Sequence, residues 1–168
     1  MNMNSLLKKS ILPIIVIALL VFLALQLNNK PVAPNVTFNT IDGEQISMDA
    51  LKNKVVLVNF WATDCPGCIK EMPELINTYK QYQPKGFEII AVAMPYDQIS
   101  QILNYTKSQA LPFPVTHDSN SEIINSFGKV SLTPTAFIYD KQGRLLQHTI
   151  GELDFKALQQ LLNKELSI

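Results

Sequence analysis

The chain has 168 residues, with 14 basic and 14 acidic side chains and a formal net charge of zero. This length suits one domain with an appendage, and the neutral balance gives no reason to expect nucleic acid as a partner. The sequence shows no internal repeat, low-complexity stretch or phosphate-binding glycine loop.

The N-terminal segment predicts a membrane anchor. Residues 11–27 are apolar apart from Gln26, which is close to the shortest length that spans a bilayer. Lys8 and Lys9 precede this run, so we expect residues 1–10 in the cytoplasm and the rest of the chain in the periplasm or extracytoplasmic space. A cleaved signal peptide is the alternative, but no small-x-small cleavage pattern follows the run.

A short linker and a folded domain follow the apolar run. Residues 28–34 are polar and contain two prolines, which is typical of a linker, and residues 35–168 form the predicted domain. The domain begins with two β-like stretches, 36–38 and 45–47, separated by an Asp-Gly turn. This pattern predicts a β-hairpin.

The only two cysteines, Cys65 and Cys68, lie between a predicted strand and a predicted helix. Residues 54–60 are almost continuously apolar and rich in β-branched side chains, which is typical of a strand buried on both faces. Pro66 suits the first turn of a helix that continues through residues 69–82. Cys65 is therefore expected at the N-terminus of this helix.

This position predicts redox chemistry. A helix N-terminus presents unpaired N–H groups and a partial positive charge, so we expect the pKa of Cys65 to lie below that of a free cysteine. The thiolate is the species that attacks a disulfide. Cys68, one turn further along, is close enough to resolve the mixed disulfide.

Other uses of two cysteines are less consistent with the sequence. A structural zinc site needs more ligands, and His117 and His148 are isolated from each other and from the cysteines. A permanent disulfide that closes so short a ring stabilises little. Inert core cysteines do not explain the strand–CxxC–helix context.

The remaining pattern alternates strands and helices, which predicts α/β architecture. The expected elements are a strand over 87–93, a helix over 98–109, a short strand over 111–116, a helix over 122–127, a strand ending at Tyr139, a turn over 140–143, a return strand over 144–150 and a last helix capped by Asp154.

The redox motif resembles that of a known family. The run Trp61-Ala62-Thr63-Asp64-Cys65-Pro66-Gly67-Cys68, followed by Lys70-Glu71-Met72-Pro73-Glu74-Leu75, is similar to the thioredoxin superfamily, and within it to the membrane-anchored TlpA/ResA/CcmG-like branch. The resemblance implies a thioredoxin-like fold, which is a central mixed β-sheet flanked by helices. It also implies an N-terminal β-hairpin extension and an N-terminal transmembrane helix.

The resemblance also assigns roles to individual residues. Cys65 and Cys68 are the redox-active pair, and Glu71 assists proton transfer. Thr133-Pro134 matches the cis-proline that faces the CxxC motif in the family, so Thr133 and Pro134, together with Trp61, are expected to bind the substrate. No cofactor or metal is implied.

Two positions depart from familiar patterns. Asn59 lies where cytoplasmic thioredoxins have a buried aspartate, and Glu71 is expected to substitute for that carboxylate. Asp64 lies where the family usually has a second tryptophan, and its negative charge opposes formation of the Cys65 thiolate.

These residues predict an extracytoplasmic thiol–disulfide oxidoreductase. By resemblance, it reduces protein disulfides, apocytochrome c among them, and receives electrons from a membrane donor of the DsbD/CcdA type. Two other activities remain open. A thiol peroxidase shares the fold, but its threonine lies three residues before the cysteine, which Thr63 does not match. A Cu(I)-binding module would use Cys65, Cys68 and Met94 as soft ligands.

Overall fold

The computed structural model describes residues 13–22 and 30–167 and divides the chain after Pro31 into two units. Within the first unit, residues 13–22 are helical and their large apolar side chains are exposed. No helix among the described residues is both long enough and apolar enough to cross a bilayer. The predicted anchor over 11–27 falls partly on residues 11–12 and 23–27, which lie outside the described residues, as do residues 1–10.

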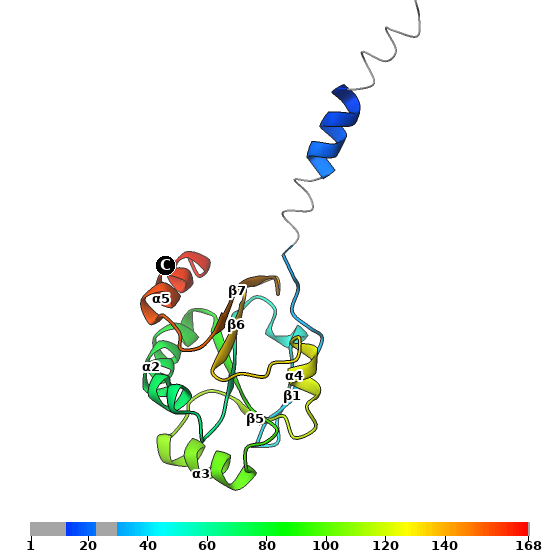
Figure 1. Cartoon of the computed structure of the whole chain (residues 1–168). Coiled ribbons are helices and arrows are strands. Elements are labelled where there is room, and N and C mark those ends of the chain that lie inside the picture. The colour runs from blue at the N-terminus through cyan, green and yellow to red at the C-terminus, as the bar shows by residue number, and fades with distance from the viewer. Residues whose placement is uncertain (1–12, 23–29, 168) are drawn as a thin grey trace, which may run out of the picture. The chain divides into compact units, whose positions relative to one another are not determined.

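A five-stranded mixed sheet forms the centre of the second unit, as predicted (Figure 1). Its strand order is β5-β4-β3-β6-β7; the first two pairings are parallel and the last two antiparallel. The strands are β3 (Val55–Trp61), β4 (Phe87–Ala93), β5 (Val115–His117), β6 (Thr135–Tyr139) and β7 (Leu145–Ile150).

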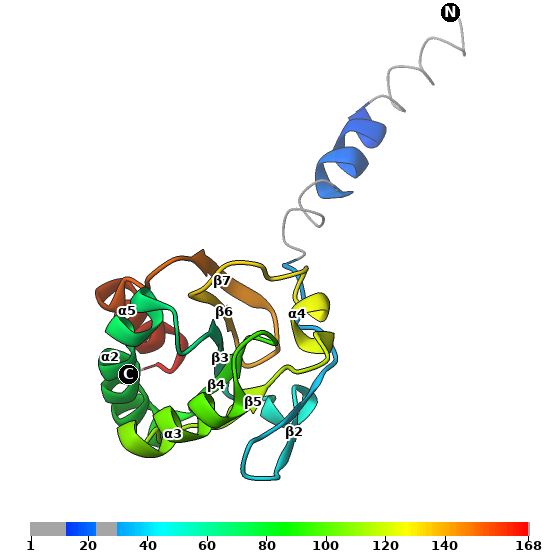
Figure 2. The same ribbon diagram turned by 60° about the horizontal axis from the view of Figure 1, so that its bottom comes forward.

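Helices cover both faces of this sheet, as the two views together show (Figures 1 and 2). One face carries three helices, α2 (Pro66–Tyr82), α3 (Ile99–Gln109) and α5 (Phe155–Glu165), and the other carries the short α4 (Glu122–Ser126). Two single 3₁₀ turns, Asp49–Leu51 and Gln83–Lys85, complete the helical segments. The architecture is therefore the thioredoxin-like α/β fold expected from the sequence.

The predicted hairpin is present and lies beside the sheet edge. Strands β1 (Thr37–Asn39) and β2 (Gln45–Ser47) pair antiparallel. The backbone N–H of Ile41 donates to the carbonyl of Val115 over 2.9 Å. Because β5 is an edge strand, this contact occupies part of an edge that would otherwise be open to another chain.

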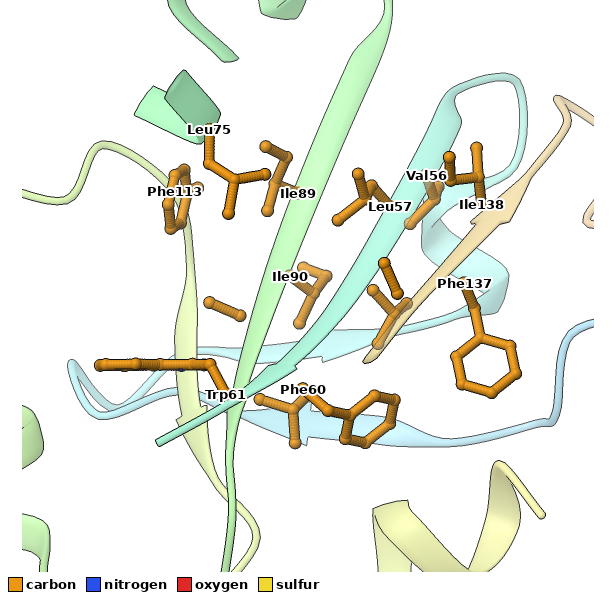
Figure 3. Close-up of a cluster of buried hydrophobic side chains, with 14 of the residues drawn as sticks. Val56, Leu57, Phe60, Trp61, Leu75, Ile89, Ile90, Phe113, Phe137 and Ile138 are labelled. Carbon is orange, nitrogen blue, oxygen red and sulfur yellow. The ribbon is translucent and has the colours of Figure 1, made fainter. Parts of the chain in front are cut away.

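The core contains all of β3, whose seven residues are buried (Figure 3). Phe60 makes edge-to-face contacts with Phe127 and Phe137, at centroid distances of 5.2 and 5.9 Å. Trp61, the next residue, contacts Tyr105 of α3. Adjacent side chains of a strand point to opposite faces, so β3 links the two layers of the core.

Strand β4 contains a buried charge that its apolar pattern did not predict. Glu88 accepts hydrogen bonds from the Tyr79 hydroxyl and the Lys54 ammonium, both over 2.9 Å. Burial, followed by this contact with Glu88, raises the pKa of the Tyr79 hydroxyl. Because both of its oxygens are hydrogen-bonded, the Glu88 carboxylate is tolerated in the sheet.

Strand β5 is shorter than the predicted strand over residues 111–116 and begins at Val115. Pro112 and Pro114 lack backbone N–H groups and cannot donate to a sheet ladder. The carbonyl of Pro114 still accepts from the backbone N–H of Ala91, so the approach to the strand is anchored to β4.

Candidate active site

The cysteine motif lies where β3 ends and α2 begins, as the sequence predicts. Cys65 is the N-cap of α2, and Pro66 is its first helical residue. The sulfur of Cys65 accepts a hydrogen bond from the backbone N–H of Cys68 over 3.2 Å. The sulfur therefore occupies the place of the side-chain oxygen that usually caps a helix, where unpaired N–H groups favour negative charge.

Cys65 and Cys68 form a disulfide, with an S–S distance of 2.15 Å and a Cα–Cα distance of 5.3 Å. The two cysteines differ in access to solvent: the Cys65 residue retains an exposed fraction of 8%, whereas Cys68 has none. An incoming thiol therefore reaches Cys65 first. This asymmetry suits one attacking and one resolving cysteine.

The Thr133–Pro134 peptide bond is cis and lies beside the motif. A methyl group placed on Gly67 would lie 3.4 Å from Cδ of Pro134. Thr133 is half-buried and Pro134 is buried. The structure thus brings together two motifs that are 65 residues or more apart in the chain, and the substrate-binding role of Thr133 and Pro134 stays a prediction.

Glu71 is buried one turn after Cys68, on the same face of α2. Its Oε1 accepts from Nδ2 of Asn59 over 3.1 Å, and its Oε2 accepts from the backbone N–H of Leu153 over 3.1 Å. Burial raises the pKa of Glu71, the two hydrogen bonds oppose this, and the charge of Glu152 adds to the increase. Glu71 therefore holds its proton to a higher pH than an ordinary glutamate.

The contact between Glu71 and Asn59 bears on the expected role of Glu71, which stays a prediction. Asn59 lies at the position of the buried aspartate of cytoplasmic thioredoxins, Glu71 was expected to substitute for that carboxylate, and the structure places the two side chains in direct contact. Asn59 comes from the middle of β3 and Glu71 from α2, so the contact joins the sheet to the helix that carries the cysteines.

Trp61, predicted to bind substrate, is instead part of the core. Its exposed fraction is 0%, and its ring contacts Tyr105. Its indole Nε1 has no hydrogen-bond partner within the described part of the chain. In this conformation Trp61 supports the cysteine loop from inside and offers no surface to a substrate.

Two carboxylates near the cysteine motif, Asp97 and Glu152, were not identified as site residues from the sequence. Asp97, buried in the loop after β4, accepts from the backbone N–H and the hydroxyl of Thr63, over 2.6 and 2.7 Å. Glu152, after β7, accepts from Nζ of Lys70 over 2.7 Å. The only hint for Asp97 in the sequence was its place after the carboxyl end of a strand, where α/β proteins bind ligands.

Asp64, the unusual neighbour of Cys65, has an exposed side chain. His148, excluded above as a zinc ligand, stacks on Phe137 with ring centroids 4.1 Å apart. Met94 is buried after β4. Its backbone N–H donates to the carbonyl of Trp61.

Comparison with known proteins agrees with this geometry. The model of the AhpC/TSA family matches residues 30–148. The chain belongs to the AhpC/TSA family. Thiol-disulfide oxidoreductase ResA of Bacillus thuringiensis subsp. konkukian is 39% identical to this AhpC/TSA-family protein over 132 residues, which are 79% of this chain and 75% of that protein.

Solved structures extend the comparison. A putative thioredoxin from Neisseria meningitidis has a TM-score of 0.76 and 35% identity, covering 83% of this chain and 92% of its own. StoA from Bacillus subtilis has a TM-score of 0.66 and 26% identity, covering 77% and 98%. This AhpC/TSA-family protein is a ResA-like thiol–disulfide oxidoreductase with Cys65 and Cys68 as its cysteine pair.

Proposed function

We propose that this protein is a membrane-anchored, extracytoplasmic reductase of protein disulfides that serves cytochrome c maturation. The observation that carries the proposal is the asymmetry of the cysteine pair beside a buried carboxylate. Cys65 reaches the surface, Cys68 is fully buried, and Glu71 lies one turn from Cys68 with a raised pKa.

The reaction follows from these positions. The Cys65 thiolate attacks one sulfur of a substrate disulfide; a mixed disulfide forms, the substrate S–S bond breaks, and the departing thiolate takes a proton. Cys68 then loses its proton, which Glu71 accepts, and attacks the sulfur of Cys65. The substrate leaves as a dithiol with two electrons and two protons, and the pair ends in the oxidised state seen here.

The helix terminus and the cis-proline loop have separate tasks in this scheme. The N–H of Cys68 stabilises negative charge on the sulfur of Cys65 when that sulfur attacks or departs. The half-buried Thr133 offers backbone groups beside the motif, and an extended substrate segment pairs with them. A membrane dithiol donor of the DsbD/CcdA type returns the pair to the reduced state.

Substrate trapping tests the proposal. The full-length Cys68→Ala variant, expressed in the source cells, cannot resolve the mixed disulfide and retains its substrates on Cys65. We expect apocytochrome c among the proteins released by reductant and identified by mass spectrometry, and none in the Cys65→Ala/Cys68→Ala control. Mixed disulfides with varied secreted proteins only, or none at all, would contradict the role in cytochrome maturation.

The location of the protein and the direction of its electron transfer are tested by separate measurements. Protease added to intact spheroplasts should digest a C-terminally tagged chain, and protection until lysis would overturn the extracytoplasmic location. Acid quenching followed by thiol alkylation should find the Cys65–Cys68 pair mostly reduced in growing cells. A mostly oxidised pair would instead indicate an oxidase.

The thiol peroxidase alternative is not favoured by the site. A peroxidase uses a threonine near its cysteine to bind the peroxide, and the hydroxyl of Thr63 is already hydrogen-bonded to Asp97. Consumption of hydrogen peroxide in a coupled assay would support the thiol peroxidase. Stoichiometric Cu(I) binding by the reduced protein, without disulfide exchange, would instead favour the copper-binding module.

A further inference from the structure

The segment between β7 and α5 contacts three parts of the redox site through three consecutive residues. The N–H of Gly151 donates to the carbonyl of Pro134 over 2.8 Å, and the N–H of Leu153 donates to Glu71. Between them, the carboxylate of Glu152 accepts from Nζ of Lys70. These contacts fix the position of the Glu152 backbone beside the cysteine motif.

The Glu152 side chain lies against the middle of the motif. A methyl group on Gly67 would lie 3.5 Å from both Cγ and Oε1 of Glu152, as well as 3.4 Å from Cδ of Pro134. The Glu152 side chain is nevertheless 45% exposed. A carboxylate therefore reaches solvent next to Gly67 and Pro134, beside the place where a substrate segment must lie if the proposed function is correct.

The ion pair with Lys70 leaves the Glu152 carboxylate available to other cations. Its side chain is 73% exposed, and an ion pair of such exposure contributes little to stability and breaks readily. A cation on an approaching chain can take the place of Lys70. Asp64, exposed immediately before Cys65, adds a second negative charge next to the motif.

We propose that Glu152 determines substrate specificity by favouring polypeptides with lysine or arginine beside the cysteine that Cys65 attacks. This inference rests on the proposed function and leaves its exchange chemistry unchanged. Charges at the edge of a binding surface act mainly on the rate of association and on its salt dependence. A basic segment is drawn to the Glu152 carboxylate and an acidic one is repelled.

The test uses two disulfide-bonded peptides of matched sequence, one with two lysines and one with two glutamates beside the cystine. The reduced full-length protein, in a neutral detergent, is mixed with each, and the ratio of the two second-order rate constants is measured. We expect the basic peptide to react about 3- to 10-fold faster at low ionic strength, and the ratio to approach one in about 1 M salt, where the Debye length is about 3 Å.

Two variants separate a charge effect from a structural one. Glu152→Gln removes the carboxylate and should lower the ratio, whereas Lys70→Met frees the carboxylate and should raise it. If the Lys70–Glu152 pair merely holds the segment in place, both variants break the same contact and shift the ratio in the same direction. Glu44→Gln, on the distant hairpin turn, is the matched control and should keep the wild-type ratio.

The outcomes separate this inference from the proposed function. An equal ratio in wild type and Glu152→Gln, or parallel shifts in Glu152→Gln and Lys70→Met, overturns the role of Glu152. Reaction of the wild-type protein with hydroxyethyl disulfide, which is small and uncharged, would then still support the oxidoreductase. Failure of the wild-type protein with every disulfide overturns both proposals.

Discussion

Asn59 donates a hydrogen bond from its side-chain amide to Oε1 of Glu71, and this contact joins the central strand to the helix that carries the cysteines. Glu71 is almost fully buried, and its second oxygen accepts from the backbone of Leu153. The carboxyl group is thus fixed in place while its pKa is raised by burial. A group held in this way, with its pKa raised from the ordinary value, suits proton transfer.

Replacing Glu71 with glutamine should slow disulfide exchange. The amide keeps the shape of the side chain but cannot accept a proton from Cys68, so we expect at least about a tenfold loss of rate near pH 7 and a flatter pH–rate profile. The measurement is stopped-flow oxidation of the reduced protein from pH 5 to 9. Glu74→Gln, on the same helix, is the control; an unchanged pH profile in Glu71→Gln would rule out the proton-transfer role.

The same substitution should change how stability depends on pH. Because the folded-state pKa of Glu71 is raised above 4.5, the folded protein keeps this proton at pH values where the unfolded chain has lost it. The contribution is therefore fully present below about pH 4.5, and it is lost as pH rises through the folded-state pKa. Urea unfolding at several pH values should show this downward slope in the wild type and a smaller one in Glu71→Gln; equal slopes would contradict it.

Asp97→Ala should destabilise the loop that leads to Cys65. The substitution removes two hydrogen bonds from Thr63 to a buried carboxylate, and bonds to charged groups contribute about 1.5–3 kcal/mol each. We expect a loss of about 3 kcal/mol in the free energy of unfolding. Thr63→Ala, which removes only the hydroxyl, should cost about 1.5 kcal/mol, and a loss as large as that of Asp97→Ala would show that the backbone contact contributes nothing.

Phe60→Ala should cost about 3–5 kcal/mol, because it leaves a cavity between Phe127 and Phe137. Chemical denaturation, read by circular dichroism, measures the change. Tyr96→Ala is a suitable comparison, since its side chain is 60% exposed and the expected change is within about 0.5 kcal/mol. Similar losses for the two variants would mean that the core depends little on the aromatic cluster.

Local sequence patterns predicted those strands and helices whose ends are set by neighbouring residues. Strand β4 has the predicted bounds, residues 87–93, because its apolar run is enclosed by a glycine and a proline-containing turn. Asp154 caps α5 as predicted and accepts from the N–H of Ala157 over 3.1 Å. The strand–Cys65–helix junction was likewise predicted, because Pro66 marks the first turn of the helix.

The contacts that complete the site could not be predicted, because they join residues far apart in the chain. Asp97 reaches Thr63 across 34 residues, and Glu152 reaches Lys70 across 82. Apart from the place of Asp97 after a strand, nothing in the sequence indicates which partners these two carboxylates have. The burial of Trp61 was missed for a related reason: the resemblance gave it a surface role, whereas helix α3 covers its ring through Tyr105.

The contacts made by Gly151 and Leu153 also have a consequence for the order of synthesis. A nascent chain that ends before residue 151 already holds both cysteines, but it lacks the donor to the Pro134 carbonyl and one of the two donors to Glu71. The sulfurs therefore emerge from the ribosome long before the groups that adjust their chemistry. The newly made polypeptide cannot acquire its mature redox behaviour before residues 151–153 have been translated.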